Sequence, residues 1–172
     1  MGLVTTAAAG AAGISPMALV MMERRGVLER ASHGVYRLAR FPVHPLVQLR
    51  LGTLWPYPVE GVLSHESALE LHELSDIMPA VVHVTVPRRY RMRRAVPAWL
   101  RLHRGEFAPD ELTHVEGIPV STVERSIRDG IAIHLGSAII GDAIEDARGR
   151  GTIDAHTADV LTAELRGDGA RR

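Results

Sequence analysis

The sequence predicts an α+β fold in two parts, an N-terminal helix-turn-helix with a β-hairpin and a mixed α/β domain with a small sheet and several helices. Two short helical segments around the turn "ISP" open the chain, and two strand-like runs around "SHG" follow them. The stretch "AVVHVTVP" is β-branched and almost wholly apolar, which is typical of an inner strand. Helical patterns dominate the chain after residue 121.

The linker between the two parts is predicted at "RFPVHP", because its two prolines interrupt both helix and strand. This places a winged helix-turn-helix at residues 1–41 and an α/β domain at 45–166. Residues 167–172 are expected to be a disordered tail, since chain ends fray unless they are packed.

The two N-terminal helices carry clear start signals. Thr5 or Thr6 can cap the alanine-rich first helix. Ser15 is a good N-cap for the second helix, and Pro16 suits its first position, where a missing N–H costs nothing. The second helix is therefore predicted to begin at Pro16 and to end near Arg25.

A basic hairpin follows the second helix. "VLERA" and "VYRLAR" alternate as strands do, and Gly34 in "SHG" permits the positive φ of a tight turn. Helix, turn, helix and hairpin is the layout of a winged helix, whose second helix would enter a DNA major groove. Only four residues precede the first helix, so the sequence leaves open whether a further helix lies upstream of Met1 or is missing.

The α/β part alternates helical and strand patterns. "LVQLRLGTLW" predicts a helix, and "GVLSHESALELHEL" predicts a short strand entering a helix capped by Ser64. Leu69 is expected to face inward on that helix, while Glu66, Glu70 and Glu73 face outward. "WLRLH" predicts a strand, and "LTHVEGIPVS" predicts a hairpin turning at Glu116.

The charges are strongly segregated although the formal net charge is zero. Residues 87–104 hold seven Arg and no acidic residue, and residues 1–50 hold six Arg against two Glu. Two basic segments of this kind can meet a polyanion even on a neutral chain. The absence of cysteine excludes disulfides and thiolate metal sites, and no apolar run is long enough to span a membrane. We expect a cytoplasmic protein.

The order and spacing of several motifs resemble the AbiEi family, the antitoxins of bacterial type IV toxin–antitoxin pairs. The motifs are "GLVTT", "AAGIS", "RRGVLER" and "GVYRL", then "VLSHESALELHELSD", "VHVTVPRR" and "GIPVSTVERSIRD". Together they cover roughly residues 2–150. The resemblance implies a winged helix that binds the operon's own promoter, and an antitoxin domain that counteracts a co-encoded nucleotidyltransferase-like toxin.

Operator DNA would be contacted mostly through phosphates, which position a protein without reading sequence. Base-reading donors are sparse on the second helix, so a homodimer on a palindromic operator is expected. The candidate DNA-binding residues lie on that helix and on the hairpin: Ser15, Met17, Arg24, Arg25, Arg30, His33 and Arg37.

The basic run after Pro87 leaves three interpretations open. It could bind nucleic acid, with Tyr90 stacking on a base, or dock an acidic surface of the toxin. It could also pair with acidic helices of its own domain at 64–76 and 142–146. The candidate contacts to toxin or nucleic acid are Arg88, Arg89, Tyr90, Arg91, Arg93 and Arg94.

No catalytic or metal motif is found, so the sequence predicts neither an enzyme nor a cofactor. His65 and His72 could share one helix face, but no third metal ligand is placed, and core or capping roles are favoured. The alternative function is a protein-only antitoxin, which would inhibit its toxin by direct complex formation without using the winged helix on DNA.

Overall fold

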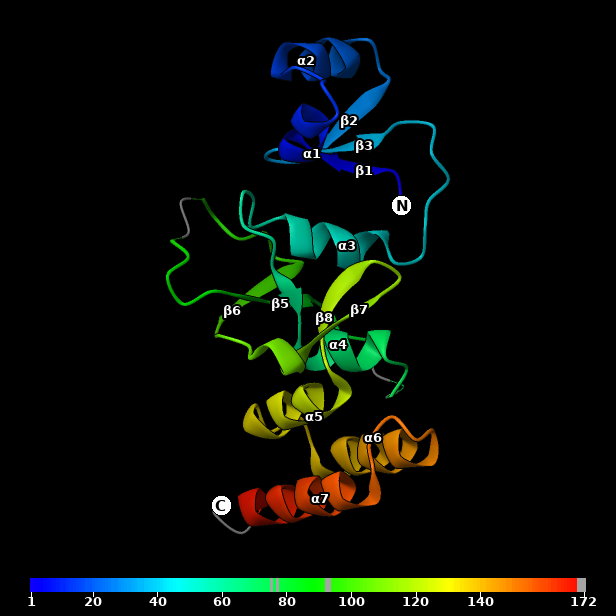
Figure 1. The fold of residues 1–172 in the computed structure, drawn as a ribbon, viewed down its shortest axis with the longest axis vertical. Helices are drawn as coiled ribbons and strands as arrows, with labels where there is room; N and C mark the ends of the chain where they lie inside the picture. Colours follow the sequence, from blue (N-terminus) through cyan, green and yellow to red (C-terminus); the bar gives the residue numbers. More distant parts are fainter. Residues whose placement is uncertain (75, 77, 92–93, 170–172) are drawn as a thin grey trace.

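The computed structural model describes residues 1–74, 76, 78–91 and 94–169, and within them the chain forms seven α-helices and eight strands. The predicted α+β class is confirmed. The strands form a three-stranded and a five-stranded sheet. In Figure 1 the smaller sheet and the first helices lie at one end of the molecule, the larger sheet lies in the middle, and the last helices are stacked at the other end.

The N-terminal unit holds both predicted helices and the predicted hairpin, together with a strand that the sequence did not indicate. Its elements are β1 (Leu3–Thr5), α1 (Thr6–Ala11), α2 (Pro16–Arg24), β2 (Leu28–Ser32) and β3 (Val35–Leu38). The strand β1 adds to the hairpin antiparallel to β3, which gives the order β1-β3-β2. Three residues are too few to show an alternating pattern, so only the pairing partner reveals this strand.

The local signals that start and end these helices act as predicted. The Thr5 hydroxyl accepts a hydrogen bond from the Ala8 N–H at 3.0 Å, and the Ser15 hydroxyl accepts one from the Ala18 N–H at 3.1 Å. Gly26, which follows α2, has a φ of +70° that suits glycine. The unit has a small core of its own, made of Ala9, Leu19, Leu28 and Tyr36.

Helix α3 (Val47–Leu54) lies between the two sheets (Figure 1). It contacts β1 on one side and packs against β4, β5 and β8 on the other. Met1 also packs against the core of the central sheet. The N-terminal unit is thus in direct contact with the rest of the chain, while the domain boundaries at 41 and 45 stay predictions.

The central sheet is mixed, in the order β6-β5-β4-β8-β7. Strand β5 is paired on both sides and is buried along its whole length, as its apolar sequence predicted. A short 3₁₀ helix, η1 (Pro109–Glu111), precedes β7. The strands are β4 (Val62–Leu63), β5 (Val82–Val86), β6 (Leu100–Arg104), β7 (Leu112–Val115) and β8 (Ile118–Ser121).

The two faces of this sheet differ in chemistry. Val82, Val84 and Val86 join Leu49 of α3 in an aliphatic cluster. The alternate β5 residues, His83 and Thr85, point to the opposite face, which is covered by α4 (His65–Leu71), and α5 (Val123–Ala132) packs against α4. Beyond α5, helices α6 (Ser137–Gly149) and α7 (Ala155–Gly169) complete a second aliphatic cluster.

Three expectations about these helices are wrong. Ser64 occupies the N-cap position of α4, but its side chain bonds to Thr85 instead of capping the helix. Glu66 turns inward rather than outward, because the first turn of α4 lies over His83, whose ring reaches its carboxylate. Helix α7 continues to Gly169, so the start of the expected disordered tail at 167 is helical, whereas 170–172 lie outside the described residues.

Candidate nucleic-acid interface

Helix α2 is anchored on one side and open on the other. Leu19 is buried in the small N-terminal core, and Met22 packs against it. On the opposite side Met17 is 71% exposed, and the side chains of Arg24 and Arg25 are exposed at the end of the helix. This free surface, together with the exposed N-cap Ser15, is what a helix needs to enter a groove of DNA.

The arginines of the hairpin are partly engaged within the protein. Arg37 lies opposite Glu29 in the β2–β3 register, and its guanidinium contacts that carboxylate at 2.5 Å. The Arg30 Nη2 lies 3.4 Å from His33 Nδ1. Because Glu29 partly neutralises Arg37, the hairpin presents less positive charge than its sequence suggests.

The tip of the hairpin packs against the segment that follows α3. Gly34 is buried at the turn with a φ of +71°, and a Cβ built on it would lie 2.6 Å from the Tyr57 ring. The His33 ring lies beside the same tyrosine, with the ring centroids 6.3 Å apart. This contact holds the hairpin tip in a defined place against the α/β part of the chain.

The described part of the basic run, which includes Arg89, Tyr90 and Arg91, lies next to this contact. No ion pair joins Arg88, Arg89, Arg91 or Arg94 to an acidic side chain in the described part of the chain, although the Arg88 backbone N–H donates to Glu106. The predicted pairing of this run with the helices at 64–76 and 142–146 is therefore not seen for these four arginines. The remaining predicted contact, Arg93, lies outside the described residues.

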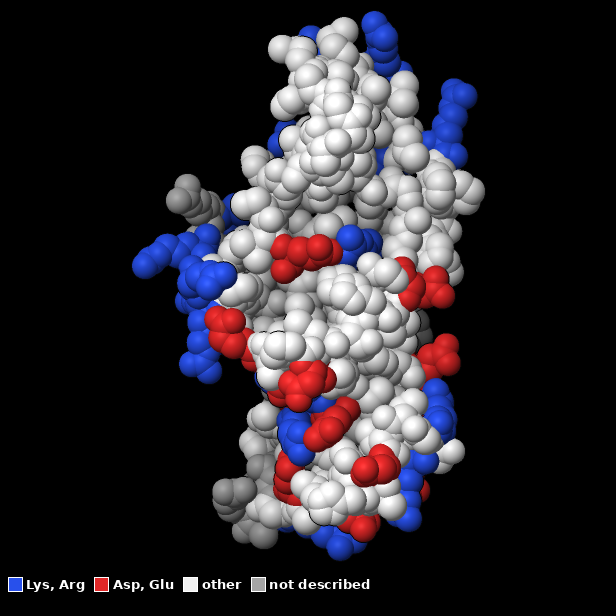
Figure 2. Space-filling view, viewed as in Figure 1, with Lys and Arg blue, Asp and Glu red and all other residues white. Residues whose placement is uncertain are grey.

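One arginine of this run has a structural role. The Arg94 guanidinium lies over the Trp55 ring, 4.2 Å from its centroid, and donates a hydrogen bond to the Trp55 carbonyl. A cation–π contact of this kind fixes the end of the loop against α3. Figure 2 shows arginine side chains gathered at the edge of the molecule beside this loop, with further arginines around the N-terminal unit.

A groove of about 780 Å³ separates the hairpin tip from the basic run. Its lining combines aromatic, apolar and basic side chains and contains no acidic one in the described chain: His33, Tyr57, Pro58, Val59, Arg89, Tyr90, Arg91 and Arg94. Sequence reasoning found the basic run but missed the groove, because Tyr57 and the hairpin meet only after folding.

A second unusual feature is a histidine network on the polar face of the central sheet, in which His83 is buried and His65 and His103 are half-buried. The His83 Nε2 lies 3.1 Å from the Glu66 carboxylate, and its Nδ1 lies 3.1 Å from His103 Nε2. A carboxylate only accepts, so His83 carries its proton on Nε2 and accepts from His103 at Nδ1. The His65 ring stacks on His103, with the centroids 3.7 Å apart.

Burial and mutual repulsion keep these histidines neutral. Burial is the main cause that lowers the pKa of His65 to about 3, assisted by its two histidine neighbours. The pKa values of His83 and His103 fall to about 4, again chiefly through burial, with Arg101 adding to the effect. In the described chain, no group of three or more histidine and acidic side chains is arranged to hold a metal ion.

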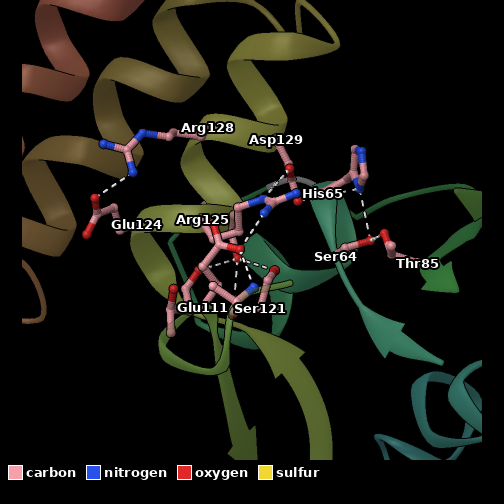
Figure 3. Close-up of polar contacts among 12 residues, drawn as sticks. Ser64, His65, Thr85, Glu111, Ser121, Glu124, Arg125, Arg128 and Asp129 are labelled. Atoms are coloured by element: carbon pink, nitrogen blue, oxygen red, sulfur yellow. Dashed lines mark hydrogen bonds and ion pairs between the residues drawn. The ribbon is translucent and has the colours of Figure 1, made fainter. Parts of the chain in front are cut away.

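The network continues into helix α5. Figure 3 shows His65 between Ser64 and Asp129, with Arg125 alongside. The His65 Nδ1 is 2.9 Å from the Ser64 hydroxyl and 3.9 Å from Asp129 Oδ2. His65 has a φ of +55°, a strained value for a residue other than glycine. The sequence motif Ser64-His65-Glu66 therefore folds into a packed polar layer, which periodicity alone had not indicated.

Comparisons with known proteins agree with the fold and with part of the sequence resemblance. The whole fold is similar to the crystal structure of the RV2827C protein from Mycobacterium tuberculosis, with a TM-score of 0.50 and 14% identity, over 95% of this chain and 76% of that one. No curated protein gives a significant sequence match. No described helix has the length and apolar character needed to cross a membrane.

The family match falls on the N-terminal unit. Residues 1–39 match the family model described as "Transcriptional regulator, AbiEi antitoxin". These residues span β1, α1, α2 and the β2–β3 hairpin, which is the part of the chain that the sequence motifs "GLVTT" to "GVYRL" had indicated. Residues 1–39 of the chain are therefore similar to the AbiEi antitoxins and transcriptional regulators.

Proposed function

We propose that this protein is an antitoxin that neutralises a co-encoded nucleotidyltransferase-like toxin and represses its own operon by binding promoter DNA. The observation that carries the proposal is the coincidence of the AbiEi match with a compact helix–turn–helix–hairpin unit. In this interpretation the unit is a winged helix, α2 is its recognition helix, and β2–β3 is its wing. The role is regulatory rather than enzymatic.

The DNA contacts are proposed to centre on α2. Arg24 and Arg25 are exposed at its end, where they can reach phosphates, while Ser15 and Met17 lie at the end that would enter the groove. Arg30 on the wing would add a phosphate contact. His33 and Arg37 are expected to contribute less, because His33 lies on Tyr57 and Arg37 is paired with Glu29.

Promoter binding provides the test. Replacing Arg24 and Arg25 by alanine is expected to weaken binding to the promoter on the order of tenfold to a hundredfold, because charged hydrogen bonds to phosphate are lost. The dependence of log K on log salt should become shallower by roughly 0.9 per lost phosphate contact. Fluorescence anisotropy with labelled promoter DNA, titrated at several salt concentrations, measures both quantities.

The matched control removes two exposed arginines at the opposite end of the molecule, Arg148 and Arg166. These alanine substitutions remove the same charge and are expected to leave the salt dependence unchanged. Equal losses in the two double variants would contradict a specific role for α2. A homodimer on a palindromic operator predicts two protected half-sites about one helical turn apart in a footprint.

Toxin neutralisation is tested separately by co-purifying the protein with the product of the neighbouring gene and measuring the native mass. We expect rescue of growth in cells that express the toxin. A stable complex would indicate direct neutralisation, and two separate species would indicate antagonism at the toxin's target or control through DNA. A rescue lost together with the complex in the Arg88→Ala, Arg89→Ala variant would assign the basic run to the toxin.

The alternative is a protein-only antitoxin whose winged helix is not used on DNA. The packing of the hairpin tip on Tyr57 favours it, since a wing held by its own protein is less free to follow a DNA backbone. Intact rescue in a protein that binds no promoter DNA at low salt would support this alternative over the main proposal.

A further inference from the structure

We propose that the groove between the hairpin tip and the basic run binds an unpaired nucleotide of a single-stranded nucleic acid. This inference does not depend on duplex binding by α2, since the groove lies at the hairpin tip and is lined by no residue of that helix. Tyr57 and Tyr90 line the groove, where a base would stack on them, and Arg89 and Arg91 supply guanidinium groups for the flanking phosphates.

The aromatic wall is held in place before any ligand arrives. The Tyr57 ring rests against Gly34, where even a methyl group would clash at 2.6 Å. The Tyr90 backbone N–H donates to the Pro87 carbonyl at 2.8 Å, and the Tyr90 side chain packs against the hydrophobic core of the central sheet. Stacking on fixed rings costs little conformational entropy, so the groove is preorganised for a flat ligand.

The charges of the groove are available to an anion. Arg89 and Arg91 are exposed, and neither forms an ion pair with a described acidic side chain. Arg94 is occupied by Trp55 and forms part of the fixed lining. Guanidinium groups recognise phosphate oxygens in a bidentate manner, which suits the backbone on either side of a stacked base.

The shape favours a single-stranded ligand over a duplex. Duplex DNA keeps its bases stacked inside and offers phosphates to a convex or extended surface, so tyrosines within a groove would gain little from it. A volume of about 780 Å³ lies within the usual range of small-molecule sites, and a nucleotide is a ligand of that class. Tyrosine and arginine also occur at protein interfaces, and the toxin-complex outcome below tests that occupant.

Binding of labelled single-stranded oligonucleotides, in RNA and DNA versions of one mixed sequence, tests the proposal with the full chain. The variant Tyr90→Leu is expected to weaken binding about fivefold to a hundredfold, the usual effect of removing one stacking partner. The conservative variant Tyr90→Phe keeps the ring and is expected to retain most of the affinity. Arg94 lines the groove and lies over the Trp55 ring, so the fluorescence of Trp55 provides an intrinsic signal for the same titration.

The charge requirement is tested with a matched pair of double variants. Replacing Arg89 and Arg91 by alanine is expected to weaken single-strand binding at least as much as Tyr90→Leu. The control replaces Arg101 and Arg104 of the neighbouring strand β6, which are also exposed, and is expected to change binding less than twofold after correction for ionic strength.

Several outcomes would overturn the proposal. Equal weakening in both arginine variants, or unchanged binding in Tyr90→Leu, would mean that single strands bind only by general electrostatic attraction. Loss of the toxin complex in Tyr90→Leu with single-strand binding intact would assign the groove to the toxin instead. Promoter binding by the Arg24→Ala, Arg25→Ala variant is measured in parallel, so failure of the winged-helix proposal is recognised independently.

Discussion

Lowering the pH from 7.5 to 5 is expected to reduce the free energy of unfolding by several kcal/mol. His65, His83 and His103 have folded pKa values of about 3, 4 and 4, against about 6.5 in an unfolded chain. Between the unfolded pKa and the folded pKa values, the unfolded chain binds more protons than the folded one. The free energy of unfolding therefore falls as the pH falls through this range. The stabilisation is fully present above pH 6.5 and is lost progressively toward the folded pKa values.

The size of this effect follows from linkage. Each histidine contributes up to about 2 kcal/mol over this pH change, because one pKa unit corresponds to about 1.4 kcal/mol. Two carboxylates face the network, Glu66 and Asp129, and they favour protonation of the histidines. Two arginines also face it, Arg101 and Arg125, and they oppose protonation. Burial is the largest cause for all three histidines, so the net dependence keeps the sign of desolvation.

Urea unfolding at a series of pH values from 7.5 to 5 measures this dependence. His103→Gln is expected to make the dependence shallower by up to about 1.4 kcal/mol per pH unit, because one coupled proton is removed. The control is His114→Asn, which removes an exposed histidine on β7 outside the network. An unfolding free energy that is the same at pH 5 and pH 7.5 would contradict the buried, neutral state of the network.

Replacing Arg125 by methionine is expected to destabilise the protein by about 2–4 kcal/mol. The Arg125 guanidinium bonds to Asp129 at 2.9 Å and to Glu111 at 2.8 Å, and it also lies over the Phe107 ring at 4.7 Å. The Asp129 side chain is only 11% exposed, so loss of its partner leaves a carboxylate that is costly to keep charged. Burial already raises the pKa of Asp129.

The same substitution three residues later provides the control. Arg128 pairs with Glu124 and Glu164, but all three side chains are about 40% exposed, so water can replace the lost contacts. Arg128→Met is therefore expected to cost no more than about 1 kcal/mol. Thermal or urea unfolding of both variants gives the comparison. Adding Asp129→Asn to Arg125→Met should restore part of the loss, and no restoration would mean that the buried carboxylate is not its source.

Local chemistry made much of the fold predictable. Ser15 and Pro16 start α2, Gly26 ends it, and the turn at Glu116 closes the β7–β8 hairpin, each within a few residues of sequence. The strand Val82–Val86 was evident from its β-branched run. The N-terminal unit was recognisable for the same reason, because its signals and its family motifs lie within residues 1–39.

Caps, turns and periodic patterns act over short distances, so the sequence by itself determined the α+β class, most helices and strands, and the similarity of the N-terminal unit to the AbiEi family model. Tertiary structure alone decided which distant side chains meet. His65, His83 and His103 come from three elements, and the groove forms only where the hairpin tip reaches Tyr57 and the basic run. Such contacts depend on how whole faces of helices and sheets pack, which no short stretch of sequence specifies.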